Sequence, residues 1–508
     1  MRLSLDAIVR AVGGELLRSG GVQAASQADG EVLSSVITDS RRASPGSLFV
    51  AVPGERVDGH DFAADAVASG AAAILAQRNP FGGSPPVPVI LVRESVSALG
   101  RLAHAWRALA GSREDGPHVV GVTGTAGKTT VKELLAQVLG RVGRTARNHL
   151  NLNNQIGLPL SMLATDGAER FWVMEAGISL PGDMDELGAM LEPDLALVLN
   201  VGSGHTQGLG DRGVAHYKAR LFAHLAPGGI AMVSADYPDL VREARGVHPE
   251  LVFFSACGRQ VEYRSAYVRP TGETSGLFRL WLDGESVDVE APFRGTFGAE
   301  NVIAVAAAAH RLGASSGEIS EGLCRAALPT QRFACSRVGS WLVIDDSYNA
   351  NPLSTVRMLE AATEMAAGLE TQAGRFAPLV CVLGEMRELG NVAQIEHKRL
   401  GEILAELRVR AVFWKGGHCE DIEAGLRQGR YEGLFIPVAG EESFLAGLEG
   451  LASEGARGGV ILFKGSRANH LEDLVNAFQD RVKREKRALF AAFSQTDIQN
   501  CGDRPDAV

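Results

Sequence analysis

The sequence predicts an α/β protein of three domains, two of which are doubly wound sheets that follow one another along the chain. A chain of 508 residues is too long for one hydrophobic core. Short apolar runs that end in glycine or polar residues alternate with helical segments, the pattern of buried parallel strands joined by helices. Two segments are candidate domain boundaries: 109–118, which is polar and contains glycine, and 323–333, which ends a helix-like alanine run. These boundaries predict domains at 1–112, 113–328 and 329–487, followed by a tail at 488–508 that we expect to be frayed.

Composition limits the classes of partner. The net charge of −10 argues against a nucleic-acid partner, because phosphate backbones require a basic face. No apolar window approaches the ~20 residues of a membrane span, and the first residues lack the apolar core of a signal peptide. The six cysteines lie far apart without a CxxC pair, which argues against a disulfide framework or a zinc site. We therefore expect a cytoplasmic protein that contacts neither nucleic acid nor membrane.

A phosphate-binding loop is predicted between a strand at 119–122 and a helix at 131–139. The generic pattern GxxxxGK[ST] requires glycine at position 122, where this chain has valine, so GTAGKTT is a shortened form. Lys128 would reach the β- and γ-phosphate oxygens, and the Thr129 hydroxyl would hold magnesium. The alternative is a glycine-rich turn with an incidental lysine. The expected nucleotide contacts are Thr123, Gly124, Thr125, Ala126, Gly127, Lys128 and Thr129.

Polar residues follow two of the middle strands. Glu175 ends the run RFWVME, and His205 lies in a glycine-rich loop after DLALVLN. Ligands of parallel sheets bind at the carboxyl ends of the strands, so Glu175 could hold a second divalent cation and His205 a metal ion or a phosphate. The alternatives are a solvated loop carboxylate and a structural histidine. A further strand is expected in GGIAMVSAD.

The last segment repeats this alternation of short apolar strands and helical stretches. Buried strands are expected in SWLVIDDSY, APLVCVLGEM, RAVFWKGG and GVILFKGS. By themselves, the polar residues of DDSYNAN would also suit a plain turn, and KGSR would suit a solvated loop.

Four motifs of the middle region occur together: GTAGKTT, MEAG, NVGSGH and YKARLF. In this combination they resemble the Mur ligase family, the ATP-dependent amide-forming enzymes of peptidoglycan synthesis. The resemblance implies two Mg²⁺ ions held by Thr129, Glu175, His205 and a carbamylated Lys218. The local sequence alone would make Lys218 an ordinary lysine on a helix surface. The resemblance also implies a small mixed α/β N-terminal domain, a central P-loop parallel-sheet ATPase domain and a Rossmann-like C-terminal domain.

The outer segments indicate which members of the family the chain resembles. The resemblance runs from about Leu5 to about Val482. The stretch at 37–75 looks like the N-terminal domain of the two later ligases of the pathway, a segment that folylpolyglutamate synthetases lack. HLNLNNQIGLPLSML, IDDSYNANPLS, LGEMRELG and FKGSR are similar to the members that add D-alanyl-D-alanine. The members that add the preceding amino acid carry DYAHTPD-like and DNPR-like segments, which we do not find in this chain.

This resemblance implies a set of ligands and contacts. The substrates would be ATP, UDP-N-acetylmuramoyl-tripeptide and D-alanyl-D-alanine, joined through an acyl phosphate by a monomeric enzyme. Lys128, Glu175, His205 and Lys218 would be the catalytic residues. Further nucleotide contacts would come from Asn301, Arg332, Asp346 and Asn349. Substrate contacts would come from Asp39, Ser40, Arg41, Asn153, Asn154, Lys464 and Arg467.

Some positions depart from the family pattern. The adenine-side GxHNxxN appears as GTFGAEN, so Phe297 and Gly298 replace histidine and asparagine while Asn301 remains. The usual GR before the third domain is Gln331-Arg332, which keeps the arginine. Gln207 stands where an acidic residue is frequent. None of these positions belongs to the phosphate or magnesium chemistry, so we expect activity to be retained.

Two other functions stay open. One is a sibling amide ligase that acts on another acid. The other is a P-loop regulator that binds ATP and a muropeptide precursor without catalysis, although a sensor would not need a second metal. The third residue of the acceptor peptide, diaminopimelate or lysine, is not specified by any legible pattern.

Overall fold

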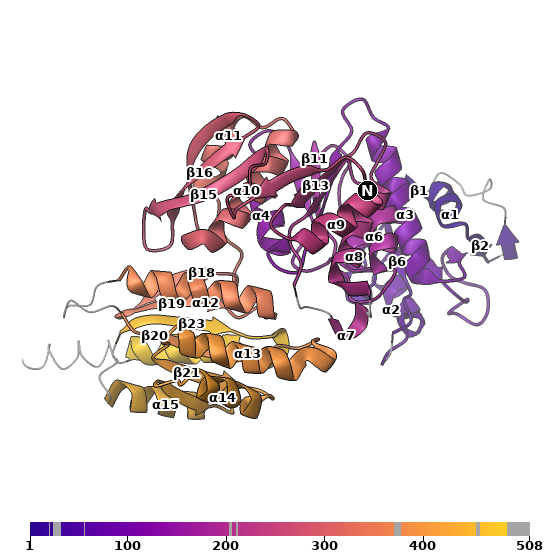
Figure 1. The fold of residues 1–508 in the computed structure, drawn as a ribbon. Coiled ribbons are helices and arrows are strands. Elements are labelled where there is room, and N and C mark those ends of the chain that lie inside the picture. Colours follow the sequence, from indigo (N-terminus) through magenta and orange to yellow (C-terminus); the bar gives the residue numbers. More distant parts are fainter. Residues whose placement is uncertain are drawn as a thin grey trace, which may run out of the picture.

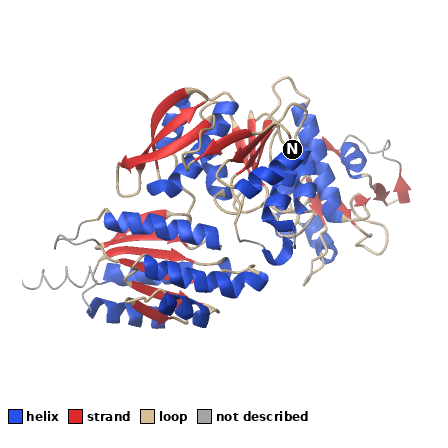
Figure 2. Cartoon of the chain, in the orientation of Figure 1, coloured by secondary structure: helices blue, strands red, loops and turns tan. Residues whose placement is uncertain are grey.

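The computed structural model describes residues 1–19, 21–23, 32–54, 56–202, 206–209, 212–369, 377–453 and 458–484, so the predicted tail lies outside it. Three large sheets covered by helices follow one another along the chain (Figure 1). The N-terminal and C-terminal units lie on different sides of the central one, and helices cover both faces of the third sheet (Figure 2). This arrangement confirms the predicted α/β class with three domains.

The N-terminal sheet is mixed. Its order is β3-β2-β8-β7-β6-β5, with parallel pairing from β5 to β8 and antiparallel pairing on both sides of β2. A separate small sheet pairs β1 with β4. The strands are β1 (Leu3–Ser4), β2 (Glu15–Arg18), β3 (Gly21–Gln23), β4 (Val32–Leu33), β5 (Ser35–Ile37), β6 (Ser47–Val50), β7 (Ala71–Ala76) and β8 (Val89–Leu91). The helices are α1 (Leu5–Val12), η2 (Ser40–Arg42), η3 (Gly59–Phe62), α2 (Ala63–Ala68) and α3 (Ser95–Gly111).

The central sheet has nine strands in the order β10-β11-β9-β12-β13-β14-β15-β16-β17. The strands are β9 (His118–Thr123), β10 (Thr145–Arg147), β11 (Phe171–Glu175), β12 (Leu195–Val198), β13 (Ile230–Ser234), β14 (Val252–Ser255), β15 (Tyr263–Pro270), β16 (Gly276–Leu282) and β17 (Glu285–Ala291). The helices are α4 (Lys128–Leu139), α5 (Gly157–Leu163), α6 (Asp183–Leu191), α7 (Thr206–Leu209), α8 (Gly213–Ala219), η5 (Arg220–His224), α9 (Pro238–Val247), α10 (Gly295–Arg311) and α11 (Ser316–Cys324).

The predicted parallel strands β11, β12 and β13 are confirmed, but the sheet is not parallel throughout. β16 and β17 extend it as antiparallel strands. β17 has the sequence ESVDVEA, in which charged and apolar residues alternate over most of its length. This pattern is typical of an edge strand that buries only one of its faces.

The third sheet has the order β18-β19-β23-β20-β21-β22 and is parallel except for the edge strand β18. Its strands are β18 (Ala334–Val338), β19 (Trp341–Asp346), β20 (Leu379–Gly384), β21 (Ala411–Lys415), β22 (Leu434–Pro437) and β23 (Gly459–Lys464). The helices are α12 (Pro352–Ala367), η6 (Gly390–Val392), α13 (Ala393–Glu406), α14 (Cys419–Gln428), α15 (Glu441–Ser453), η7 (Arg467–Asn469) and a last helix over 471–484. All four buried strands that the sequence predicts here are present.

Two hydrophobic cores cross from one unit to the next. One core joins the N-terminal sheet to the α3, α5 and α6 face of the central sheet and includes Trp106 and Trp172. The other joins the α4 and α10 face of the central sheet to the third sheet and includes Val122 and Leu462. Helix α12 lies on the side of the third unit that faces the central one (Figure 1). The second of these cores fixes the strand ends of the central and third sheets relative to one another.

No helix within the described ranges is both long enough and apolar enough to span a bilayer. The five cysteines that the structure describes are free thiols.

Candidate active site

A cavity of about 480 Å³ lies between the strand ends of the central sheet and the third domain. It collects most of the residues that the sequence predicts for the site. From the central domain these are Thr125, Ala126, Gly127, Lys128, Thr129, Asn153, Asn154 and Glu175, and from the third domain Arg332, Asp346, Asn349, Lys464 and Arg467. The predicted nucleotide and substrate residues therefore share one cavity, although their individual roles stay predictions.

The phosphate loop joins β9 to α4 as expected. Gly127 has φ 80°, in the left-handed region, and α4 begins at Lys128. A Cβ at Gly127 would lie 2.6 Å from Asn301 Oδ1, so both the backbone conformation and the close approach of α10 require glycine there. Thr123 and Gly124 lie behind the cavity, and a Cβ at Gly124 would lie 3.0 Å from Leu199 Cβ. Asn301 therefore packs beside the loop.

Asn200, which the sequence reasoning missed, holds the phosphate loop from behind. Its Oδ1 accepts hydrogen bonds from Thr125 N at 3.1 Å and Ala126 N at 2.8 Å, and its Nδ2 donates to Ala126 O at 3.1 Å. The side chain is 1% exposed. Asn200 follows β12 much as Glu175 ends β11, so the strand-end rule that singled out Glu175 could have found it.

We expect Asn200→Ala to weaken nucleotide binding. The substitution leaves the buried Ala126 N–H without its side-chain acceptor, at a cost of ~1–3 kcal/mol for an unsatisfied group, whereas Thr125 N keeps its bond to the Asn200 carbonyl oxygen. Calorimetric titration with ADP measures the effect. Asn79→Ala removes an asparagine from a loop of the N-terminal domain, where Nδ2 donates to Gly83 O, and serves as the control. Unchanged ADP affinity in Asn200→Ala would show that the loop keeps its shape without this side chain.

Glu175 is held through both carboxylate oxygens. Thr129 Oγ1 donates to Oε2 at 2.7 Å, and Asn153 Nδ2 donates to Oε1 at 2.7 Å. Asn148 fixes the backbone of the same residue, because its Oδ1 accepts from Glu175 N and its Nδ2 donates to Glu175 O. Two of the predicted magnesium ligands, Thr129 and Glu175, are thus in direct contact. Hydroxyl and carboxylate oxygens are ligands that suit Mg²⁺.

The loop that carries Asn153 is anchored by a buried lysine that the sequence reasoning did not single out. Lys132 Nζ donates to Asn148 O at 2.7 Å and to Leu150 O at 3.0 Å, and its side chain is 0% exposed. Leu150 has φ 49°, in the left-handed region. Helix α4 therefore supports both the phosphate loop and, through Lys132, the polar side chains around Glu175.

Lys218 is buried, so the interpretation of it as a surface lysine is wrong. It lies on α8 and is 1% exposed. Desolvation lowers the pKa of Lys218 well below its ordinary value, the charge of Lys128 adds to this, and Glu175 opposes it. Desolvation also lowers the pKa of Lys128, with Glu175 opposing and Arg332 adding to the shift. The charges of the two amines and of Glu175 therefore influence one another.

His205 lies outside the described residues, so one of the four expected metal ligands is not placed. Within the described ranges, no group of three or more His, Cys, Asp or Glu side chains could hold a metal ion.

The third domain contributes a polar wall to the cavity. Asp346 Oδ1 accepts from Phe333 N at 3.0 Å, and its other oxygen pairs with Lys464. Lys464 Nζ also donates to Asn349 O at 3.1 Å. The Arg332 guanidinium carbon lies 4.2 Å from the centre of the Tyr348 ring. Lys464, expected at the substrate, thus contacts two residues that are expected at the nucleotide.

An aromatic cluster forms another part of the cavity wall. Phe293, Phe297 and Phe333 pack with ring centres 6.0–6.2 Å apart. A Cβ at Gly298 would lie 2.4 Å from Phe293 Cβ, so glycine makes room for this ring. The replacement of histidine and asparagine by Phe297 and Gly298 therefore gives the cavity an apolar wall.

The predicted uridine-diphosphate residues lie apart from the cavity. Asp39, Ser40 and Arg41 belong to the turn at η2 in the N-terminal domain, and none of them lines the cavity. The Arg41 side chain donates to both Asp39 oxygens, at 2.9 and 2.8 Å, and lowers the pKa of Asp39 to about 2.

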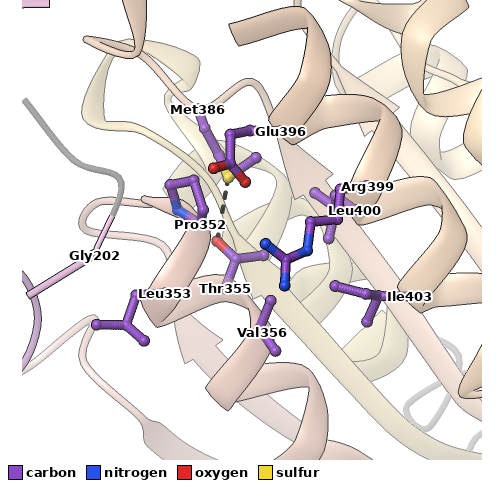
Figure 3. Close-up of a pocket in the computed structure, with 10 residues that line it drawn as sticks. All are labelled: Gly202, Pro352, Leu353, Thr355, Val356, Met386, Glu396, Arg399, Leu400 and Ile403. Atoms are coloured by element: carbon purple, nitrogen blue, oxygen red, sulfur yellow. Dashed lines mark hydrogen bonds between the residues drawn. The ribbon is translucent and has the colours of Figure 1, made fainter. Parts of the chain in front are cut away.

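A second cavity of about 230 Å³ is lined by the residues shown in Figure 3. It is bounded by Gly202 and by residues of α12 and α13. Leu353, Val356 and Ile403 contribute apolar groups, and Thr355 Oγ1 donates to Met386 Sδ at 3.7 Å. Helix α12 therefore contributes residues to both cavities.

Comparison with known proteins matches all three units. Residues 32–107 match the Mur ligase family catalytic domain, 122–309 the Mur ligase middle domain, and 331–467 the Mur ligase glutamate ligase domain.

Relatives match over most of their length. The chain is 32% identical to the UDP-N-acetylmuramoyl-tripeptide--D-alanyl-D-alanine ligase of Escherichia coli K12, covering 88% of this chain and 94% of the relative. MurF from Acinetobacter baumannii superposes with a TM-score of 0.82 at 27% identity, covering 94% and 99% of the two chains. MurF from Thermotoga maritima in complex with ADP gives 0.74 at 28% identity, covering 89% and 98%. All three units and most of the chain's length thus match one family, and the chain belongs to the Mur ligase family.

Proposed function

We propose that this protein is the ATP-dependent ligase that joins D-alanyl-D-alanine to the terminal carboxylate of UDP-N-acetylmuramoyl-tripeptide. The product would be the UDP-N-acetylmuramoyl-pentapeptide, a cytoplasmic precursor of peptidoglycan. The observation that carries the proposal is the cavity in which the phosphate loop and Glu175 meet Arg332, Asp346 and Lys464 of the third domain. Relatives with this architecture bear the name of this activity.

The reaction needs an activated carboxyl group, because a carboxylate is a poor acylating agent at neutral pH. The tripeptide carboxylate attacks the γ-phosphorus of ATP, which gives an acyl phosphate and releases ADP. The amine of D-alanyl-D-alanine then attacks the acyl carbon, and inorganic phosphate leaves from the tetrahedral intermediate. The protein contributes mainly positioning and charge neutralisation to the phosphoryl transfer. Lys128 of the central domain and Arg332 of the third domain, which both line the cavity, would supply positive charge to the phosphates.

Magnesium would neutralise charge on the phosphates and orient the migrating phosphoryl group. Thr129 and Glu175 would hold it together with His205 and Lys218. Support for Lys218 comes from its burial, since a carbamate forms only on a neutral amine and desolvation favours that form. A carbamate would turn a buried cation into an oxygen ligand for the metal.

Removal of divalent cations is expected to abolish ligation while the protein stays folded. The phosphate-transfer step depends on the metal, whereas the fold depends on the hydrophobic cores that the units share. Phosphate release is measured after chelation with EDTA and again after addition of Mg²⁺, with circular dichroism as the control for folding. Full activity in EDTA would contradict a magnesium-dependent site.

The substrates would occupy different parts of the structure. Asn153, Asn154, Lys464 and Arg467 lie in the same cavity as the phosphate loop, where the reacting ends of the two peptides must meet. The uridine-diphosphate end would reach the Asp39-Ser40-Arg41 turn of the N-terminal domain. The third domain would exclude water from the acyl phosphate. We propose that the enzyme acts as a monomer without nucleic-acid or membrane partners.

The decisive test compares acid and amine pairs. Phosphate release and product mass are measured with the UDP-tripeptide, in its diaminopimelate and lysine forms, together with D-alanyl-D-alanine. The comparison reaction uses the UDP-dipeptide with diaminopimelate or lysine as the amine. ATP-dependent pentapeptide formation is expected from the first pair alone. Turnover of the second pair would indicate a sibling ligase, and nucleotide binding without any turnover would indicate a regulator.

A further inference from the structure

Helix α12 of the third domain makes polar contacts with the central domain at its N-terminal cap and again further along the helix. At its N-terminal cap, Asn351 Oδ1 accepts from Ser354 N while Nδ2 donates to Thr125 O of the phosphate loop at 3.2 Å. Further along the helix, Arg357 forms an ion pair with Glu300 of α10 and donates a hydrogen bond to the Tyr237 hydroxyl. The same helix thus reaches both the loop and a buried polar cluster.

This cluster is connected to the phosphate loop. Glu300 Oε1 accepts from the Tyr237 hydroxyl at 3.0 Å and from Asn200 Nδ2 at 3.4 Å. The Asn200 amide in turn accepts the N–H groups of Thr125 and Ala126 through Oδ1. An unbroken series of contacts therefore runs from Arg357 in the third domain, through Glu300 and Asn200, to the backbone of the phosphate loop.

The burial of these groups makes them depend on one another. The Glu300 side chain is 7% exposed and the Arg357 side chain 18% exposed. A buried carboxylate that loses its cation keeps only its hydrogen-bond donors, so Glu300 is expected to shift toward water. Such a shift moves the oxygen that Asn200 Nδ2 contacts, and with it the orientation of the amide that holds the loop.

We propose that Arg357 is a positioning residue for the phosphate loop. Through Glu300 and Asn200 it aligns the Thr125 and Ala126 N–H groups when α12 is packed against the central domain. The third domain thereby controls nucleotide binding through the back of the loop, in addition to the side chains that it places in the cavity. The expected change in ligation kinetics rests on the proposed function, whereas the expected change in ADP affinity does not.

The chain offers a matched control in a second ion pair between the same two domains. Arg337 of β18 donates to Glu273 of the turn after β15 at 2.8 Å, and both side chains are about half exposed. Neither residue lines the cavity. If Arg357 served only to attach the third domain, Arg337→Ala and Arg357→Ala would have similar effects.

The experiment uses the full chain and titrates ADP by calorimetry into the wild type and each variant. Arg357→Ala is expected to lower ADP affinity about tenfold, equivalent to ~1.4 kcal/mol. Arg357→Lys, which keeps the charge, is expected to recover part of the loss, and Arg337→Ala to change the affinity less than about twofold. In ligation assays, Arg357→Ala should raise the KM for ATP and lower kcat, with the KM for D-alanyl-D-alanine unchanged.

Two outcomes would overturn the inference: wild-type ADP affinity in Arg357→Ala, or an equal loss in Arg337→Ala. If Arg357→Ala does not fold, Arg357→Lys and Tyr237→Phe carry the test, and wild-type ADP affinity in both would overturn it. Because ADP binding is measured without the other substrates, it decides the role of Arg357 even if the chain proves to ligate a different pair.

Discussion

Lys128→Ala is expected to lower ligase turnover by roughly 10³-fold or more, because it removes a positive charge at the migrating phosphoryl group, where charge develops in the transition state. Lys128 begins α4 and lines the same cavity as Arg332 of the third domain. The rate of phosphate release at saturating substrate measures the effect. The melting temperature should change little, because the ammonium would contact the nucleotide and belongs to no hydrophobic core of the described residues.

Lys398→Ala is a suitable control for this loss. Lys398 is an exposed lysine on α13, and its removal is expected to leave turnover unchanged. Near-normal ligation by Lys128→Ala would show that GTAGKTT is a strand-to-helix turn with an incidental lysine, the alternative that its sequence alone leaves open.

Lys218→Ala is expected to be nearly inactive and to regain part of its activity when small carboxylic acids are added. The substitution removes the proposed carbamate oxygens and leaves a buried volume that a small carboxylate would enter if the site holds the metal. Lys218→Arg keeps a positive charge that would repel the metal, so it should be inactive and should not respond to the acids. Turnover is measured across a series of acids of increasing size.

Rescue that depends on the size of the acid would distinguish a lost ligand from a lost packing contact. Propionate or acetate should act best if the vacated volume sets the limit, and a neutral amide of the same size should have no effect. A fully active Lys218→Ala would leave this residue a structural role only.

The parts of the fold that the sequence predicts are those determined by local pattern. Buried parallel strands such as β11 and β20 are continuous apolar runs, and a strand end places Glu175 in the cavity regardless of the details of packing. The phosphate loop is local as well, since its glycines and its helix start lie within a few residues. The antiparallel edge at β16 and β17 was missed because weak alternation in a single strand does not reveal its partner.

The residues that sequence reasoning missed depend on contacts between distant segments. Lys132 has the sequence surroundings of an ordinary helix lysine, yet the loop at 148–150 covers it and provides carbonyl acceptors. Lys218 is buried for a similar reason. Arg357 acquires its partner only when the third domain packs against α10. Residue spacing within one segment does not reveal contacts with a distant segment. The residues that support the site could therefore be identified only from the structure.

Helix α3 has a practical consequence for dividing the molecule. It ends at Gly111, beside the predicted boundary at 112, yet its apolar face belongs to the core that also contains Trp172, and Trp106 Nε1 donates to Thr165 Oγ1 at 2.9 Å. A cut at this boundary would expose this face on one fragment and the α5 and α6 surfaces on the other. Separately expressed fragments would therefore tend to aggregate, and on heating the intact chain the first two units would melt in one calorimetric transition.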